Sequence, residues 1–193
     1  GLLTGSATIR LTGASTKITA TVLNMNGGTI INEGTWTNPL NANINLDDTT
    51  SGGAGTILNK GTWNFTASAT YDNSFDGGQV QNEGLMHSIA GTSRIYGAVH
   101  HRSGSTFRCS AGWMTFQGGG TMVTGATLDA DGGDLYFQGG THTLSGGSIT
   151  GSRFVYASSN TVNITGEVNS PTGPATGGFG INGGTVTGTG TLS

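Results

Sequence analysis

Apolar and polar residues alternate along most of this chain. In TVNITG, the apolar residues Val162 and Ile164 alternate with Thr161, Asn163 and Thr165. A period of two places successive side chains on opposite faces of an extended strand, whereas a helical pattern would repeat every 3.6 residues. We find no segment with helical periodicity. The pattern therefore predicts an all-β protein built from short strands.

One phrase occurs three times in the first half of the chain. GTIINEGTW begins at Gly28, GTILNKGTW at Gly55 and the looser copy GQVQNEGLM at Gly78, so the steps are 55-28=27 and 78-55=23 residues. In the second half, aligning Phe116 with Phe137 gives a step of 137-116=21. The repeating unit is therefore about 21 residues long, with insertions in the first half.

Two further alignments predict how neighbouring units of the second half lie against each other. Thr121 aligns with Thr141, a step of 20, and Leu135 aligns with Phe154, a step of 19. Each unit reads as three short strands closed by Gly, Asn or Asp. A fixed repeat of three strands must be explained by the fold.

A β-solenoid explains this repeat better than a sandwich or a barrel does. Its coils stack at about 4.8 Å, so that similar side chains fall above one another. Strands joined by hairpins in a sandwich have no reason to repeat every 21 residues. We predict that residues 1–193 form one domain, a parallel β-helix of about nine coils, since 193/21 is about nine. Coils of varying length without a six-residue rhythm favour the right-handed form.

The second copy of the phrase, GTILNKGTW, predicts which side chains enter the core. Ile57 and Trp63 should point inward, while Thr56, Lys60 and Thr62 face solvent. Residues at one position of successive coils should form ladders, with amides bonding along the rod and large apolar groups stacking in the core. These ladders comprise Asn32, Asn59 and Asn82, and Trp36, Trp63 and Met86. Asn59 is expected at a turn before Gly61, where both residues tolerate a left-handed backbone.

The variable charged position of the phrase suggests two explanations. Glu33, Lys60 and Glu83 alternate in sign, so Lys60 is either a catalytic lysine between two carboxylates or part of a charge ladder. At about 4.8 Å three like charges would repel, whereas alternating charges attract. We therefore favour the ladder. The alignment of the second half places another opposite pair, Asp134 and Arg153, side by side.

Composition narrows the class of protein and of partner. Glycine supplies 37 of 193 residues, only three are proline, and charged residues make up 9%, which suits packed strands and tight turns better than disorder. With a net charge of -3 and only two lysines, the chain has no basic patch for nucleic acid. No apolar run approaches the ~20 residues that cross a bilayer, so we expect no membrane insertion. The single Cys109 is expected to be a small buried residue, because it alternates with Arg108.

DADGGD contains the densest acidic cluster, formed by Asp129, Asp131 and Asp134. Calcium would need several oxygen ligands, but the calcium-binding GGxGxD repeat of toxins has only one loose approximation here, so turn-forming aspartates are favoured. Asp129 and Asp131 lie on one face of an extended segment, about 7 Å apart, within the range for an inverting glycosidase. They are the best catalytic candidates of the chain. No metal or cofactor is predicted.

His100, His101 and Arg102 could suggest a metal site or a lyase base. Adjacent residues on a strand point to opposite faces, and no cysteine or carboxylate stands at ligand spacing. We therefore expect a loop or a solvated strand at this position.

The phrase N-[EK]-G-T-W within glycine- and threonine-rich coils resembles the repeats of bacterial surface right-handed parallel β-helices. These include autotransporter passengers, filamentous-haemagglutinin-like adhesins and other large secreted exoproteins. The similarity covers most of the chain and rests on composition and period. It implies an extracellular or cell-surface protein, and it carries over no catalytic motif.

Both ends of the chain show strand alternation, in GLLTGSATIRLTG and in GGTVTGTGTLS, without a capping helix or charged edge. We therefore expect either a segment of a longer rod or self-association through terminal coils. The leading hypothesis is a non-catalytic structural solenoid, serving as a fibre or filament subunit or as an adhesin shaft. The alternatives are a polysaccharide lyase or glycosidase, and a carbohydrate-binding solenoid that contacts a surface glycan through exposed Tyr96, Trp113 or Tyr136.

Overall fold

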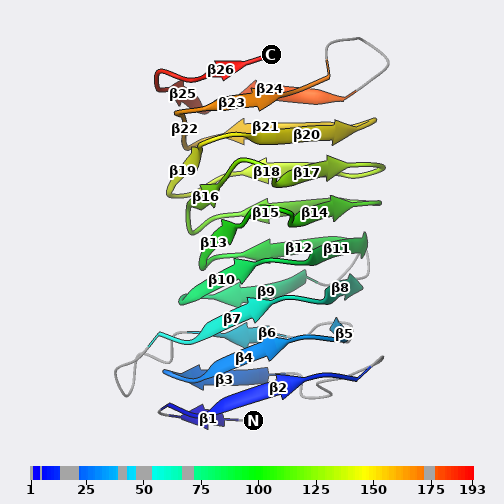
Figure 1. Ribbon diagram of the computed structural model, residues 1–193, viewed down its shortest axis with the longest axis vertical. Helices are drawn as coiled ribbons and strands as arrows, with labels where there is room; N and C mark the ends of the chain where they lie inside the picture. Colours follow the sequence, from blue (N-terminus) through cyan, green and yellow to red (C-terminus); the bar gives the residue numbers. More distant parts are fainter. Residues whose placement is uncertain are drawn as a thin grey trace.

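Three parallel sheets wrap around one core in the computed structural model of the protein (Figure 1). The structure describes residues 2–4, 6–13, 22–38, 43–46, 54–66, 72–171 and 177–193. No helix occurs in these ranges, and the strands of each sheet pair in parallel. The two ends of the chain lie at opposite ends of the rod. The predicted all-β parallel solenoid is confirmed.

Each coil contributes one strand to each sheet. Sheet A contains β1 (Leu2–Thr4), β3 (Val22–Asn26), β6 (Asn43–Asn45), β9 (Asp72–Asp76), β12 (Thr92–Ile95), β15 (Trp113–Phe116), β18 (Asp134–Phe137), β21 (Phe154–Ser158) and β24 (Gly178–Asn182). Sheet B contains β2 (Thr8–Leu11), β4 (Thr29–Asn32), β7 (Thr56–Asn59), β10 (Gln79–Asn82), β13 (Ala98–His101), β16 (Gly120–Met122), β19 (Thr141–Leu144), β22 (Thr161–Ile164) and β25 (Thr185–Thr187). Sheet C contains β5 (Thr35–Asn38), β8 (Thr62–Thr66), β11 (Leu85–Ala90), β14 (Thr106–Cys109), β17 (Thr127–Ala130), β20 (Gly147–Gly151), β23 (Glu167–Asn169) and β26 (Thr191–Leu192).

The predicted count of nine coils is slightly too high. Sheet C has eight strands within the described residues, which limits the number of coils with all three strands to eight. At the N-terminal end, β1 and β2 form a partial coil. The estimate from chain length divided every residue among full coils, but some residues belong to that partial coil and to loops between strands.

The core is a column of inward side chains. In β7 and β8, buried and half-buried residues alternate, with Ile57, Trp63 and Phe65 fully buried. At Thr56 and Thr62 the side chains point outward and are half-buried. The same alternation fills the column with one apolar layer per coil, and burial of this apolar surface is the main favourable term in folding. Large fully buried side chains include Trp36, Trp63, Phe65, Phe107 and Phe116.

Register between coils follows the predicted alignment in one case of three in the second half. Phe116 lies opposite Phe137, as expected. Leu135 lies opposite Val155 and not Phe154, because a one-residue shift would place outward Phe154 in the core. Residue Thr121 pairs with Thr143, two residues beyond the expected Thr141. A shift of two residues keeps every side chain on its face, so the alternation alone does not detect it.

Glycine in the repeated phrase is required for a different reason from the one the sequence suggested. Asn59 has an ordinary strand conformation and ends β7, and Gly61 does not adopt a left-handed backbone. A Cβ atom at Gly61 would instead collide with the carbonyl oxygen of Gly34 in the preceding coil. Gly34 and Gly84 occupy equivalent positions with the same close approach. The coils therefore touch backbone to backbone at this corner, and only glycine fits.

Candidate functional site

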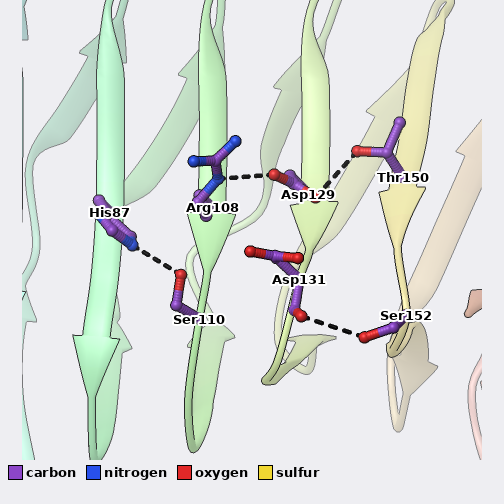
Figure 2. A network of polar contacts seen from close by, with 7 residues as sticks. All are labelled: His87, Arg108, Ser110, Asp129, Asp131, Thr150 and Ser152. Atoms are coloured by element: carbon purple, nitrogen blue, oxygen red, sulfur yellow. Dashed lines mark hydrogen bonds and ion pairs between the residues drawn. The ribbon is translucent and has the colours of Figure 1, made fainter.

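Asp129, the central acidic candidate, lies on the outer face of sheet C (Figure 2). Arg108 and Thr150 occupy the matching positions of the neighbouring coils. The Nε atom of Arg108 donates to Asp129 Oδ2 at 2.7 Å, and Thr150 Oγ1 donates to Asp129 Oδ1 at 3.1 Å. Only 8% of Asp129 is exposed. Both carboxylate oxygens are thus engaged with adjacent coils, which makes this group a poor proton donor.

Asp131 follows β17 on the same side of the rod as Asp129, as expected from their spacing (Figure 2). Its side chain is exposed, and its backbone carbonyl accepts a hydrogen bond of 3.1 Å from Ser152 Oγ. Of the three acidic candidates, Asp131 is the most accessible to a ligand.

Asp134 belongs to sheet A, and the corner between β17 and β18 separates it from the other two aspartates. Arg153 Nη2 donates to Asp134 Oδ2 at 2.9 Å, and the backbone N–H of Phe154 donates to Asp134 Oδ1 at 3.2 Å. The structure therefore does not bring the three acidic candidates together. Within the described ranges, no group of three or more His, Cys, Asp or Glu side chains could hold a metal ion.

A hydrogen bond between His87 and Ser110 was missed by the sequence reasoning. His87 Nε2 lies 2.8 Å from Ser110 Oγ, beside the Arg108 and Asp129 pair (Figure 2). Burial lowers the pKa of His87, and the positive charge of Arg108 lowers it further. A neutral imidazole could accept the proton of Ser110, but in the described part of the chain no carboxylate hydrogen-bonds to the ring to orient it. The two residues belong to copies with little sequence similarity, so no alignment signalled their contact.

His100 and His101 point to opposite faces of β13, as their adjacency predicted. His100 Nδ1 lies 2.9 Å from Thr121 Oγ1 on the outer face. The expectation of a loop or solvated strand is wrong for His101, which is only 3% exposed. Its ring packs edge-on against Phe107 and Phe116, with centroids 6.0 and 5.8 Å away. An inward position on a strand buries even a histidine when its neighbours are apolar.

Asparagine side chains run along the inside of sheet B at one position of successive coils. Asn32 Nδ2 donates to Asn59 Oδ1 at 2.7 Å, and Asn59 Nδ2 donates to Asn82 Oδ1 at 2.8 Å. Each amide also donates to a backbone carbonyl one coil further on, such as that of Leu85 for Asn59. His101 occupies the next position, where its Nδ1 lies 3.4 Å from Asn82 Nδ2. The ladder therefore continues into a histidine, which the sequence repeat did not indicate.

Trp36 and Trp63 stack in the core with ring centroids 4.6 Å apart and planes 4° from parallel. Met86 occupies the next position of this row, opposite Trp63, and is fully buried. The indole N–H of Trp63 donates to Asn38 Oδ1 at 3.1 Å. The indole stack thus contributes both apolar burial and a satisfied polar group to the same layer.

Glu33, Lys60 and Glu83 follow the asparagine ladder and stand at matching positions, but their side chains do not form the expected ladder of ion pairs. Glu33 Oε1 instead contacts Arg10 Nη1 at 2.6 Å. Lys60 is exposed, and neither it nor Glu83 takes part in an ion pair with the other described residues. Exposed side chains are free to leave the row, because water screens their attraction.

Reversing the charge at this row is expected to have a small effect. The change Lys60→Glu would place a third negative charge in line with Glu33 and Glu83 and should lower the melting temperature by less than about 4 °C at low salt. Thermal unfolding with and without 1 M salt measures this, since the Debye length falls to about 3 Å there. The neutral variant Lys60→Gln is the control. An unchanged melting temperature of Lys60→Glu at low salt would show that the row is not coupled.

The three aromatic candidates for carbohydrate binding are all at the surface of the rod. Tyr96 is 38% exposed and follows β12, and Trp113 is 49% exposed at the start of β15. Tyr136 is half-buried on β18. Trp113 and Tyr136 line one groove on sheet A, whereas Tyr96 does not line it.

Cys109 is fully buried, as its alternation with Arg108 predicted. Burial raises the pKa of its thiol to about 11. The thiol is therefore protonated at neutral pH and inert as a nucleophile.

The described strands and their ladders define the chain as a parallel β-solenoid. Comparison with protein-family models, curated proteins and solved structures finds no match to the chain. Within the described residues, no helix is long and apolar enough to span a bilayer.

Proposed function

We propose that the chain is a non-catalytic structural β-solenoid of the cell exterior, serving as a fibre or filament subunit or as the shaft of an adhesin. One observation carries this proposal. The buried or half-buried carboxylates best placed for chemistry, Asp129 and Asp134, are each bound to an arginine of the adjacent coil. These groups tie coil to coil and are not held ready for a substrate.

The resemblance of the N-[EK]-G-T-W repeats to bacterial surface β-helices supports an extracellular location. The composition agrees with it, since the chain has few lysines and one cysteine. Many backbone bonds and side-chain ladders running along the axis favour a rod that carries mechanical load along its length.

Self-association through terminal coils belongs to the same proposal. The last coil exposes two large apolar residues, Ile181 at 64% and Leu192 at 42%. Such residues on an open solenoid edge favour the addition of a further coil, here from a second copy of the chain.

Assembly is expected to depend on these two residues. At rising concentration the purified chain should form end-to-end particles, visible by electron microscopy and as increasing mass in light scattering. The double change Ile181→Lys and Leu192→Lys should keep it monomeric, because repelling charges replace apolar contacts. Ile89→Lys is the matched control, since Ile89 is 39% exposed but lies on the side of the rod, on β11. Unmodified chains that stay monomeric with folded terminal coils would remove the filament version.

The rival function is a polysaccharide lyase or glycosidase, for which exposed Asp131 is the most accessible carboxylate. A screen for cleavage of neutral and acidic polysaccharides tests it. We expect no turnover. Cleavage that is lost in Asp131→Asn would overturn the structural proposal.

A further inference from the structure

A groove of about 530 Å³ crosses the outer face of sheet A. Its lining comes from outward positions of three successive strands, β12, β15 and β18, which pair in register. The groove is lined by Arg94, Trp113, Thr115, Gln117, Tyr136 and Gln138. Its volume is within the usual range of small-ligand sites.

The aromatic rings of the groove are supported from one side. Tyr136 stacks on Tyr156 of β21, with centroids 5.1 Å apart and planes 19° from parallel. Phe154 in turn packs against Tyr156 at 5.5 Å. Trp113 leaves 49% of its surface exposed at one end of the groove. A ring held in this way presents apolar surface without further loss of side-chain freedom on binding.

Neutral polar groups complete the lining. Gln117 Nε2 donates to Gln138 Oε1 at 3.4 Å, so two planar amides lie side by side along the rod. Each amide carries more donors and acceptors than this one bond uses. Burial raises the pKa of Tyr136, with a further contribution from Asp134, so its hydroxyl stays protonated.

Charges near the groove are already compensated. Asp134, which precedes Tyr136, binds Arg153 and the backbone of Phe154 through its two oxygens. Arg94, at the opposite side of the groove, takes part in other interactions. An ionic ligand would have to compete with these contacts, whereas an uncharged one would not. The electrostatics therefore match a neutral ligand.

We propose that this groove binds a neutral, β-linked polysaccharide chain. Pyranose rings offer a C–H face that stacks on aromatic side chains and a rim of hydroxyls that bond to amides, which is the combination present here. The coil spacing of about 4.8 Å is close to the length of one sugar residue in an extended chain, so successive residues meet successive coils. This binding goes beyond the structural function, because a rod can carry load with or without a glycan on its side.

Tryptophan fluorescence locates binding at the groove. Of the three tryptophans, Trp36 and Trp63 are fully buried and Trp113 is half exposed. Quenching by acrylamide therefore reports mainly on Trp113. Cellohexaose, xylohexaose and mannohexaose serve as probes, and we expect at least one of them to protect Trp113 from the quencher. If none of the three does, the proposal is wrong.

Calorimetric titration with the protective hexasaccharide measures the contribution of the groove. Trp113→Ala should weaken binding about tenfold or more, and Gln138→Ala should weaken it less, because an exposed amide contributes less than an aromatic anchor. Ile89→Ala, on sheet C, should bind like the unmodified chain and controls for loss of exposed apolar surface. Each variant is first shown to be folded by its circular dichroism and melting temperature.

Three outcomes of these titrations would overturn the proposal. Unchanged affinity in Trp113→Ala would place binding elsewhere on the rod. Equal loss in Ile89→Ala would show a general surface effect. Tighter binding of hexagalacturonate than of the neutral hexasaccharides would show that the site selects acidic sugars. Assembly of the rod is measured separately, so neither result decides the other.

Discussion

Acidification from pH 7.5 to 4.5 is expected to lower the free energy of unfolding by roughly 2 kcal/mol for each of two buried histidines, His101 and His142. Burial lowers the pKa of His101 to about 3, with further lowering by the neighbouring His142. Burial also lowers the pKa of His142 to about 4. Both imidazoles line a small internal cavity together with Phe116 and Phe137, where a charge would be poorly solvated.

The direction of this effect follows from proton binding. Below the ordinary histidine pKa of 6.5, the unfolded chain binds protons that the folded chain does not, so stability falls as the pH decreases. Above about pH 6.5 the contribution is fully present. It is lost progressively between pH 6.5 and the folded pKa values, about 4 for His142 and about 3 for His101. Since domains are commonly stable by 5–15 kcal/mol, the loss is a large fraction of the total.

Urea unfolding of the full chain at the two pH values measures the loss. His101→Asn should reduce the difference between them by about half, because asparagine does not titrate and can accept from Asn82 as the next member of the ladder. His100→Asn is the matched control, since His100 is adjacent but faces outward toward Thr121. Burial lowers the pKa of His100 as well, but its ring remains partly solvated, so a smaller change is expected. Equal relief in both variants, or none in His101→Asn, would contradict the assignment.

Removing one amide from the asparagine ladder is expected to destabilise the rod by about 3 kcal/mol or more. In Asn59→Ala, Asn82 Oδ1 and the carbonyl of Leu85 lose their donor, and Asn32 loses its acceptor at Asn59 Oδ1. Asn59 and its ladder neighbours are fully buried, so water does not replace these bonds without opening the core. Each unsatisfied buried group costs about 1–3 kcal/mol.

The same urea titration at pH 7.5 measures this effect. Asn64→Ala, one strand further on and half-buried on the outer side of β8, serves as the matched control and should change the unfolding free energy by less than about 1 kcal/mol. The near-isosteric change Asn59→Asp separates shape from hydrogen bonding, because a carboxylate does not donate and would be a buried charge. It should be at least as destabilising as Asn59→Ala. A cost below 1 kcal/mol in both Asn59 variants would show that the ladder contributes little.

Sequence reasoning predicted the candidate site only in part. It selected the aspartates of DADGGD, but proximity along the chain said nothing of the corner that separates Asp134 from Asp129 and Asp131. It aligned Asp134 with Arg153 through a register that is wrong by one residue, although the two side chains do meet at 2.9 Å because both are long enough to tolerate the shift. It could not find the contact of His87 with Ser110, since these residues are 23 positions apart in dissimilar copies.

The sequence by itself determined the class of fold. Alternation with a period of two specifies strands, and a repeat of about 21 residues specifies that they stack as coils. Both signals are local or periodic, so they survive without knowledge of the contacts. The inward positions of Ile57 and Trp63 follow from the same alternation.

Only the tertiary structure decided what each side chain meets in the next coil. A two-residue shift between coils preserves the alternation, so pairs such as Thr121 with Thr143 depend on turn lengths and packing. Close backbone approach, not a left-handed turn, explains Gly61. The groove at Trp113 and Tyr136 likewise exists because three coils of different sequence align their outward side chains. Contacts between coils are nonlocal, and small differences in coil length decide them.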